Sequence, residues 1–287
     1  MEPRSFHVAG ADGHRIHVLE WSTEGVPLVF VHGFGNSAHI WADAAPVVAP
    51  HYRTLAIDQR GHGDSEHDPE HRYDYEDLAR DLEAVTEALA IERFVLVGHS
   101  LGGRTAMVFA GRNPDRLAGL VIVDTGPEHD PRGTSRIRQE VEQRGDGTVG
   151  SVGEYERLLA HNFPVSSGEV IRRMAAAELR QREDGRWERK IDPTFFPARA
   201  DMNEAEMEAR EREMSEELWK ILETVPCPTL VVRGAASDIL GPEIADRMVD
   251  EALPNGQLAI VGQSAHSVMT DNPEGFNEAL AKFVLGE

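Results

Sequence analysis

Residues 94–111 read FVLVGHSLGGRTAMVFAG, and the fold prediction starts from this stretch. Phe94–Val97 is a continuous apolar run, typical of a strand covered on both faces of a sheet. Leu101–Gly111 has the composition of a helix. Between them, Gly98-His99-Ser100-Leu101-Gly102 matches G-x-S-x-G, which predicts a sharp strand–turn–helix with an exposed hydroxyl on Ser100. Taken alone, these five residues are also compatible with a serine that only caps a helix.

Further apolar runs extend the pattern on both sides of this stretch. Alternating residues in Phe6–Ala9 and Arg15–Trp21 predict an antiparallel pair at a sheet edge. Denser runs predict strands at Pro27–Val31, Thr54–Ile57, Leu120–Val123, Thr229–Val232 and Leu258–Val261. Helical spacing is found in Asp77–Leu89 and Asn277–Leu285. The sequence therefore predicts an α/β fold with a mostly parallel eight-stranded sheet flanked by helices.

One region, from about Gly126 to Trp219, interrupts this alternation. It is charged, shows no convincing strand, and has helical segments at Glu169–Arg182 and Glu204–Trp219. Scattered large apolar residues favour a folded helical insertion over a disordered linker. We therefore expect a core made of residues 1–126 and 219–287, with a helical insertion at 127–218.

A serine hydroxyl needs a base to become a nucleophile. In proteins built around this strand–turn–helix motif, the acid and then the histidine follow the serine along the chain. His266 is the only histidine after His161 and follows the last predicted strand, so it is the predicted base. Two aspartates follow core strands before it. Asp238, in a loop after Thr229–Val232, is favoured as the acid, and Asp124, directly after Leu120–Val123, is the alternative.

Two backbone N–H groups are expected to stabilise a tetrahedral intermediate. The N–H of Leu101, directly after the nucleophile, is the first. The second is predicted at Phe34, in the His32-Gly33-Phe34-Gly35 segment that follows the strand Pro27–Val31. A simple glycine turn is the alternative for this segment.

Composition limits the partners of the chain. Its 287 residues carry 29 basic and 50 acidic side chains, a formal charge of -21 that would repel nucleic acids and anionic membranes. A single cysteine, no signal-peptide pattern and no long apolar run favour a cytoplasmic location. A small-molecule substrate is the predicted partner, and the oligomeric state is open.

No metal or cofactor is predicted. His7, His14 and His17 lie near the first hairpin, but they lack an accompanying cysteine or carboxylate set. No glycine pattern fits a dinucleotide fingerprint. Trp41, Trp187 and the pair Phe195-Phe196 are equally compatible with lining a pocket and with plain packing.

Taken together, these motifs resemble the α/β-hydrolase superfamily, in its form with a helical cap. The resemblance rests on the segment Asp58-Gln59-Arg60-Gly61-His62-Gly63-Asp64-Ser65 together with the serine, histidine and glycine motifs above, and it spans essentially the whole chain. It implies that the insertion forms a lid over Ser100, and that Arg60 and His62 have a support role. A serine nucleophile argues against haloalkane dehalogenases and most epoxide hydrolases.

The predicted activity is therefore hydrolysis of a carboxylic ester or lactone through an acyl-enzyme on Ser100. The same triad would serve a carbon–carbon bond hydrolase or a cofactor-free perhydrolase. A ligand-sensing protein without activity is a further alternative, which a complete triad disfavours.

Overall fold

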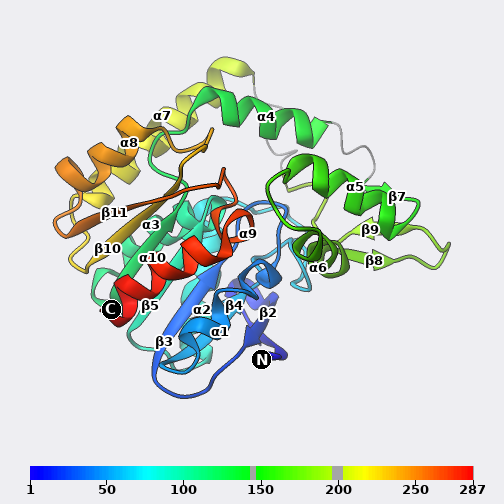
Figure 1. Ribbon diagram of the computed structural model, residues 1–287, viewed down its shortest axis with the longest axis horizontal. Helices are drawn as coiled ribbons and strands as arrows, with labels where there is room; N and C mark the ends of the chain where they lie inside the picture. Colours follow the sequence, from blue (N-terminus) through cyan, green and yellow to red (C-terminus); the bar gives the residue numbers. More distant parts are fainter. Residues whose placement is uncertain (143–146, 196–202, 287) are drawn as a thin grey trace.

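The structure, a computed structural model, describes residues 1–142, 147–195 and 203–286. Its centre is an eight-stranded sheet of order β1-β2-β4-β3-β5-β6-β10-β11 (Figure 1), which confirms the predicted α/β architecture. The first two strand pairs are antiparallel and the others are parallel. The strands are β1 (Arg4–Ala9), β2 (Arg15–Glu20), β3 (Val26–Val31), β4 (Tyr52–Ile57), β5 (Phe94–His99), β6 (Leu117–Val123), β10 (Thr229–Gly234) and β11 (Gly256–Val261).

Helices cover both faces of this sheet, with short helical turns in the connections. On one side lie α2 (Tyr75–Ala88), α3 (Leu101–Arg112), α7 (Glu204–Leu222) and α8 (Pro242–Arg247). On the other lie η2 (Ala38–Trp41), α1 (Ala45–Val48), α9 (Val268–Asp271) and α10 (Pro273–Leu285). The remaining turns are η1 (Ala11–Gly13), η3 (Pro114–Arg116) and η5 (Met248–Ala252).

Each buried central strand contributes side chains to the hydrophobic clusters on both faces of the sheet. In β3, Val29 and Val31 join one hydrophobic cluster, while Leu28 and Phe30 join the other. Successive side chains of a strand point to opposite faces, so a strand that is apolar throughout must be covered twice. This explains why continuous apolar runs identified the central strands.

The insertion follows β6, and most of its elements lie to the right of the sheet in Figure 1. It contains α4 (Pro131–Glu142), β7 (Thr148–Val149), α5 (Val152–Asn162), α6 (Gly168–Glu178), β8 (Leu179–Gln181) and β9 (Trp187–Arg189). Helices α5 and α6 pack on each other around a small cluster of their own that includes Tyr155, Leu159 and Met174.

The expectation of an insertion without strands was wrong. Strands β7, β9 and β8 form a three-stranded antiparallel sheet, and α6 ends at Glu178 instead of continuing to Arg182. Strands of two or three residues are too short to show an alternating pattern. The signal that could have revealed them is Asp184-Gly185, a hairpin-turn pair in which Gly185 has φ +82°.

The division into a core and a cap at residue 218 stays a prediction. Helix α7 runs through this boundary, and both Leu218 and Leu222 lie in the core cluster that contains α3. The C-terminal half of α7 therefore packs with the sheet layer. Within the described part of the chain, every helix is too short or too polar to cross a membrane.

Candidate active site

Ser100 lies in a strained turn between the central strand β5 and helix α3. Its backbone has φ +52° and ψ -114°, outside the regions that residues other than glycine favour. The backbone amide of Ser100 donates to the Val123 carbonyl at 3.0 Å, which ties the turn to β6. A Cβ on Gly102 would lie 2.5 Å from the Val31 carbonyl oxygen, so only glycine allows this close approach.

His266 reaches Ser100 from the loop between β11 and α9. Its Nε2 lies 3.0 Å from Ser100 Oγ, although the two residues are 166 positions apart. The loop is held by the Ala265 amide, which donates to Asp271 Oδ2 at 2.9 Å. The predicted base therefore lies within hydrogen-bond reach of the predicted nucleophile.

Asp124 is the aspartate that contacts His266. Its Oδ2 lies 2.8 Å from His266 Nδ1, and its side chain is fully buried. The Gly234 amide donates to Oδ1 at 2.9 Å, and the Ser237 hydroxyl donates to Oδ2 at 2.6 Å. Because a carboxylate only accepts hydrogen bonds, His266 Nδ1 must donate and Nε2 is left to accept the proton of Ser100.

The preference for Asp238 over Asp124 is corrected by this geometry. Asp238 forms a two-pronged ion pair with Arg136 of α4, at 2.7 and 2.9 Å, and does not contact His266. Its pKa is lowered by the Arg136 hydrogen bond, against the opposing effect of burial. The register of β5 and β6 pairs His99 with Val123, which brings the next residues, Ser100 and Asp124, to the same sheet edge.

The predicted oxyanion site is assembled beside this turn. Leu101 is the first residue of α3, where an N–H group has no partner within the helix. A Cβ on Gly33 would lie 2.6 Å from His99 Nδ1 and 3.2 Å from Ser100 Cβ, so the loop after β3 packs directly against Ser100. Phe34 lines the same cavity as Ser100. These positions are compatible with the donors predicted at Phe34 and Leu101, whose role stays a proposal.

Two buried histidines hold the loops around Ser100. His99 Nε2 lies 2.9 Å from the backbone oxygen of His266 and donates to it. His32 Nε2 accepts from the Gln59 amide at 3.0 Å, and its Nδ1 donates to the Gly33 oxygen at 2.7 Å. Burial lowers the pKa of His32, and burial together with the nearby His266 lowers the pKa of His99 well below its ordinary value. Both rings therefore stay neutral in the folded protein.

From these two histidines we predict that the folded protein becomes less stable in mild acid. Their pKa values are lowered on folding, so below about pH 6.5 the unfolded chain binds protons that the folded chain does not. The free energy of unfolding should therefore fall as the pH drops from 7 to 5, by up to about 1.4 kcal/mol per pH unit for each histidine. Urea denaturation at several pH values measures this slope.

The substitution His99→Gln should make that slope shallower, because one buried ring with a lowered pKa is removed. The exposed His51 provides the matched control, and His51→Gln should leave the slope as it is in the parent protein. An identical slope in His99→Gln and the parent would show that this ring does not titrate on unfolding.

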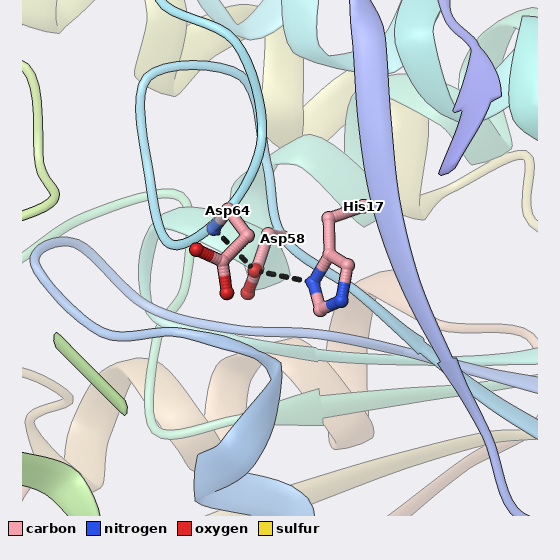
Figure 2. A group of neighbouring side chains, drawn as sticks. All are labelled: His17, Asp58 and Asp64. Atoms are coloured by element: carbon pink, nitrogen blue, oxygen red, sulfur yellow. Dashed lines mark hydrogen bonds and ion pairs between the residues drawn. The ribbon is translucent and has the colours of Figure 1, made fainter. Parts of the chain in front are cut away.

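The segment 58–65 forms a support network behind the site (Figure 2). Asp58 Oδ2 lies 2.7 Å from His17 Nδ1 and accepts from the Asp64 amide at 2.9 Å, while Oδ1 accepts from the Ala38 amide at 2.6 Å. Burial opposes ionisation of Asp58, but the His17 hydrogen bond, the nearby His32 and His17 rings and the Ala38 amide together outweigh it and keep the carboxyl pKa low.

His17, Asp58 and Asp64 are also close enough together to hold a metal ion. However, the Asp58 carboxylate is saturated by the donors just described. Asp64 is bound by Lys190 of the insertion at 2.7 Å. The group therefore acts as a structural contact between β2, the 58–65 loop and the insertion, and carries no metal proposal.

Arg60 and His62, which the resemblance assigns a support role, are both fully buried. Arg60 binds Asp81 of α2 at 2.5 and 2.8 Å and Asp68 at 3.0 Å. The His62 ring lies 5.9 Å from the Phe34 ring. These contacts hold the segment against α2 and against the predicted oxyanion loop.

A cavity of about 440 Å³ opens over Ser100 between the core and the insertion. The insertion contributes Arg136, Tyr155, Phe163, Glu178 and Arg189 to its wall, among other residues. Its lining is therefore mixed, with charged groups beside aromatic rings. This position agrees with the predicted lid over the nucleophile.

The aromatic residues considered as pocket lining lie elsewhere. Trp41 is fully buried in the core, and Trp187 packs in the α5–α6 cluster. Phe195 stacks on Tyr73 at 4.6 Å between ring centroids, and Phe196 lies outside the described residues. Among the described aromatic residues, Phe34, Tyr155 and Phe163 line the cavity, and no periodic pattern in the sequence distinguishes them.

The fold and this site together define a class of protein, and comparison with known proteins agrees. The sequence profile of the alpha/beta hydrolase fold matches residues 26–273, so the chain belongs to the alpha/beta hydrolase family. The superfamily expected from the motifs is thereby confirmed.

Relatives within this family have varied names. The chain is 26% identical over 260 residues to the 2-(acetamidomethylene)succinate hydrolase of Mesorhizobium japonicum, covering 91% of this chain and 88% of that protein. It is 29% identical over 288 residues to the non-heme chloroperoxidase of Streptomyces lividans, covering 96% and 98%. The crystal structure of an alpha/beta hydrolase from Novosphingobium aromaticivorans has a TM-score of 0.81 at 28% identity, covering 98% of both chains.

Proposed function

We propose that this protein hydrolyses a carboxylic ester or lactone through a triad of Ser100, His266 and Asp124. The observation that carries the proposal is the continuous chain of contacts, 3.0 Å from Ser100 Oγ to His266 Nε2 and 2.8 Å from His266 Nδ1 to Asp124 Oδ2. Membership of a family of hydrolases and the cavity over Ser100 support it. No metal or cofactor takes part in the proposed reaction.

The first half of the reaction forms an acyl-enzyme. His266 Nε2 takes the proton of the Ser100 hydroxyl while Oγ attacks the ester carbonyl carbon. The oxygen that becomes negative is stabilised by the Leu101 and Phe34 amides. Asp124 stabilises the resulting imidazolium through Nδ1–H. The carbon–oxygen bond to the alcohol then breaks, and His266 returns the proton to the leaving alkoxide.

The second half repeats these steps with water. His266 Nε2 accepts a proton from a water molecule, whose oxygen attacks the acyl carbonyl on Ser100. The bond to Oγ breaks, Oγ recovers its proton from His266, and the carboxylic acid leaves. For a lactone, the alcohol and the acid are the two ends of one product.

A fluorophosphonate probe tests the proposed nucleophile directly. The probe should label the protein once, and mass spectrometry should locate the adduct on Ser100, because an activated serine attacks phosphorus as it attacks a carbonyl. Short-chain 4-nitrophenyl esters should be hydrolysed by the same preparation. An unlabelled protein that also turns over none of these esters would contradict the proposal.

A cofactor-free perhydrolase is the second candidate. The similarity to a protein named as a non-heme chloroperoxidase over almost the whole chain favours this reading over the others with the same triad. Peroxide-dependent halogenation of monochlorodimedone separates the two activities. Halogenation at a rate above that of ester hydrolysis would make the perhydrolase the better assignment.

A further inference from the structure

Most of the charged side chains in the wall of the cavity already have a hydrogen-bond or ion-pair partner in the protein. Arg136 is paired with Asp238 on two oxygens. Asp271 accepts from the Ala265 amide and from the Ser166 hydroxyl, both at 2.9 Å. None of these side chains needs a charged partner from a ligand.

Glu178, at the end of α6, is occupied in the same way. It is buried and accepts from the Tyr155 hydroxyl at 2.6 Å and from the Asn36 amide at 3.4 Å. Tyr155 and Asn36 also line the cavity. The carboxylate is therefore already engaged by groups of the protein.

Arg189, the last residue of β9, is the exception. Its guanidinium lies over the Tyr155 ring, 5.4 Å from the ring centroid, and lines the cavity that contains Ser100. No described residue forms an ion pair with it, and its Nε is buried without a hydrogen-bond partner. A buried donor with no partner is destabilising.

We propose that Arg189 binds a carboxylate carried by the substrate, so that the enzyme acts on esters or lactones with a free acid group. The planar guanidinium can donate two parallel hydrogen bonds to a carboxylate. Because Nε is buried, Nη1 and Nη2 are the groups that would donate these two hydrogen bonds. A cation–π contact with the Tyr155 ring keeps the guanidinium in position. This inference rests on the proposed function, because it names the substrate class of the same site.

Two esters of similar length test this specificity, 4-nitrophenyl hydrogen glutarate and the uncharged 4-nitrophenyl hexanoate. Arg189→Gln should lower kcat/KM for the glutarate ester about 10- to 100-fold, with the loss mainly in KM, and should change the hexanoate value little. Arg189→Lys keeps the charge without the planar fork and should fall between the parent and Arg189→Gln.

Arg182 provides the matched control on the same small sheet. It is exposed, and Asp184 and Glu188 already pair with it. Arg182→Gln removes one positive charge from the insertion, so it reports any general electrostatic effect. Both esters should be hydrolysed by this variant as by the parent.

Calorimetric binding of glutarate to the Ser100→Ala protein gives a reading that does not depend on turnover. Glutarate should bind, and the added change Arg189→Gln should weaken it about 10-fold or more. Equal glutarate binding with and without Arg189, or an equal loss for both esters, overturns the inference even while hexanoate turnover upholds the proposed function. If the parent hydrolyses neither ester, the proposed function fails and glutarate binding alone decides the role of Arg189.

Discussion

Ser100→Ala is expected to lower ester turnover about 10⁶-fold while the protein stays folded. The substitution removes the attacking oxygen, and no other group in the contact chain from His266 can replace it. Folding should survive because the hydroxyl does not cap helix α3, and alanine meets the same backbone strain as serine. Steady-state hydrolysis of a 4-nitrophenyl ester measures the loss, and circular dichroism and thermal unfolding report the fold.

Ser135→Ala serves as the control for this experiment. Ser135 is an exposed serine on α4, so its hydroxyl should be irrelevant to turnover. A Ser100→Ala protein that keeps more than about a hundredth of the parent rate would mean that the hydrolysis arises elsewhere, from another residue or a contaminant.

Asp124→Asn is expected to have the second-largest effect, a fall in kcat of about 10⁴-fold. An asparagine amide can donate to His266 Nδ1, which favours the tautomer with its proton on Nε2. That tautomer can no longer accept the proton of Ser100. The change is nearly isosteric, but the contacts from the Gly234 amide and the Ser237 hydroxyl limit how the new amide can orient. The effect is measured by comparing kcat of Asp124→Asn with kcat of the parent under conditions in which both proteins are fully folded.

Asp238→Asn is the matched comparison, because it removes the same charge from the other aspartate considered as the acid. Its ion pair with Arg136 is partly exposed, so the change should lower kcat by less than about tenfold. If Asp238→Asn removed activity and Asp124→Asn did not, the contact between Asp124 and His266 would have no catalytic meaning.

Much of the fold could be predicted from short stretches of sequence. Central strands such as β3 and β5 are apolar on both faces, and helix α2 has a clear apolar stripe. The type of each element can therefore be predicted from its own residues. The strands β7, β8 and β9 could not be seen in this way. They are two or three residues long, and pairing with one another, not local pattern, makes them strands.

The residues of the candidate site also differ in how far the sequence alone could predict them. Ser100 is marked by its glycine turn and His266 by its isolation near the end of the chain, so the sequence alone determined the proposed nucleophile and base. Only the tertiary structure shows which of the two aspartates, Asp124 or Asp238, contacts His266. Both follow a core strand, but β6 lies next to β5 in the sheet, while Arg136 from the distant helix α4 occupies Asp238. Which strands are neighbours, and which side chains reach across from an insertion, depend on packing between segments far apart in the chain, and no local pattern encodes that packing.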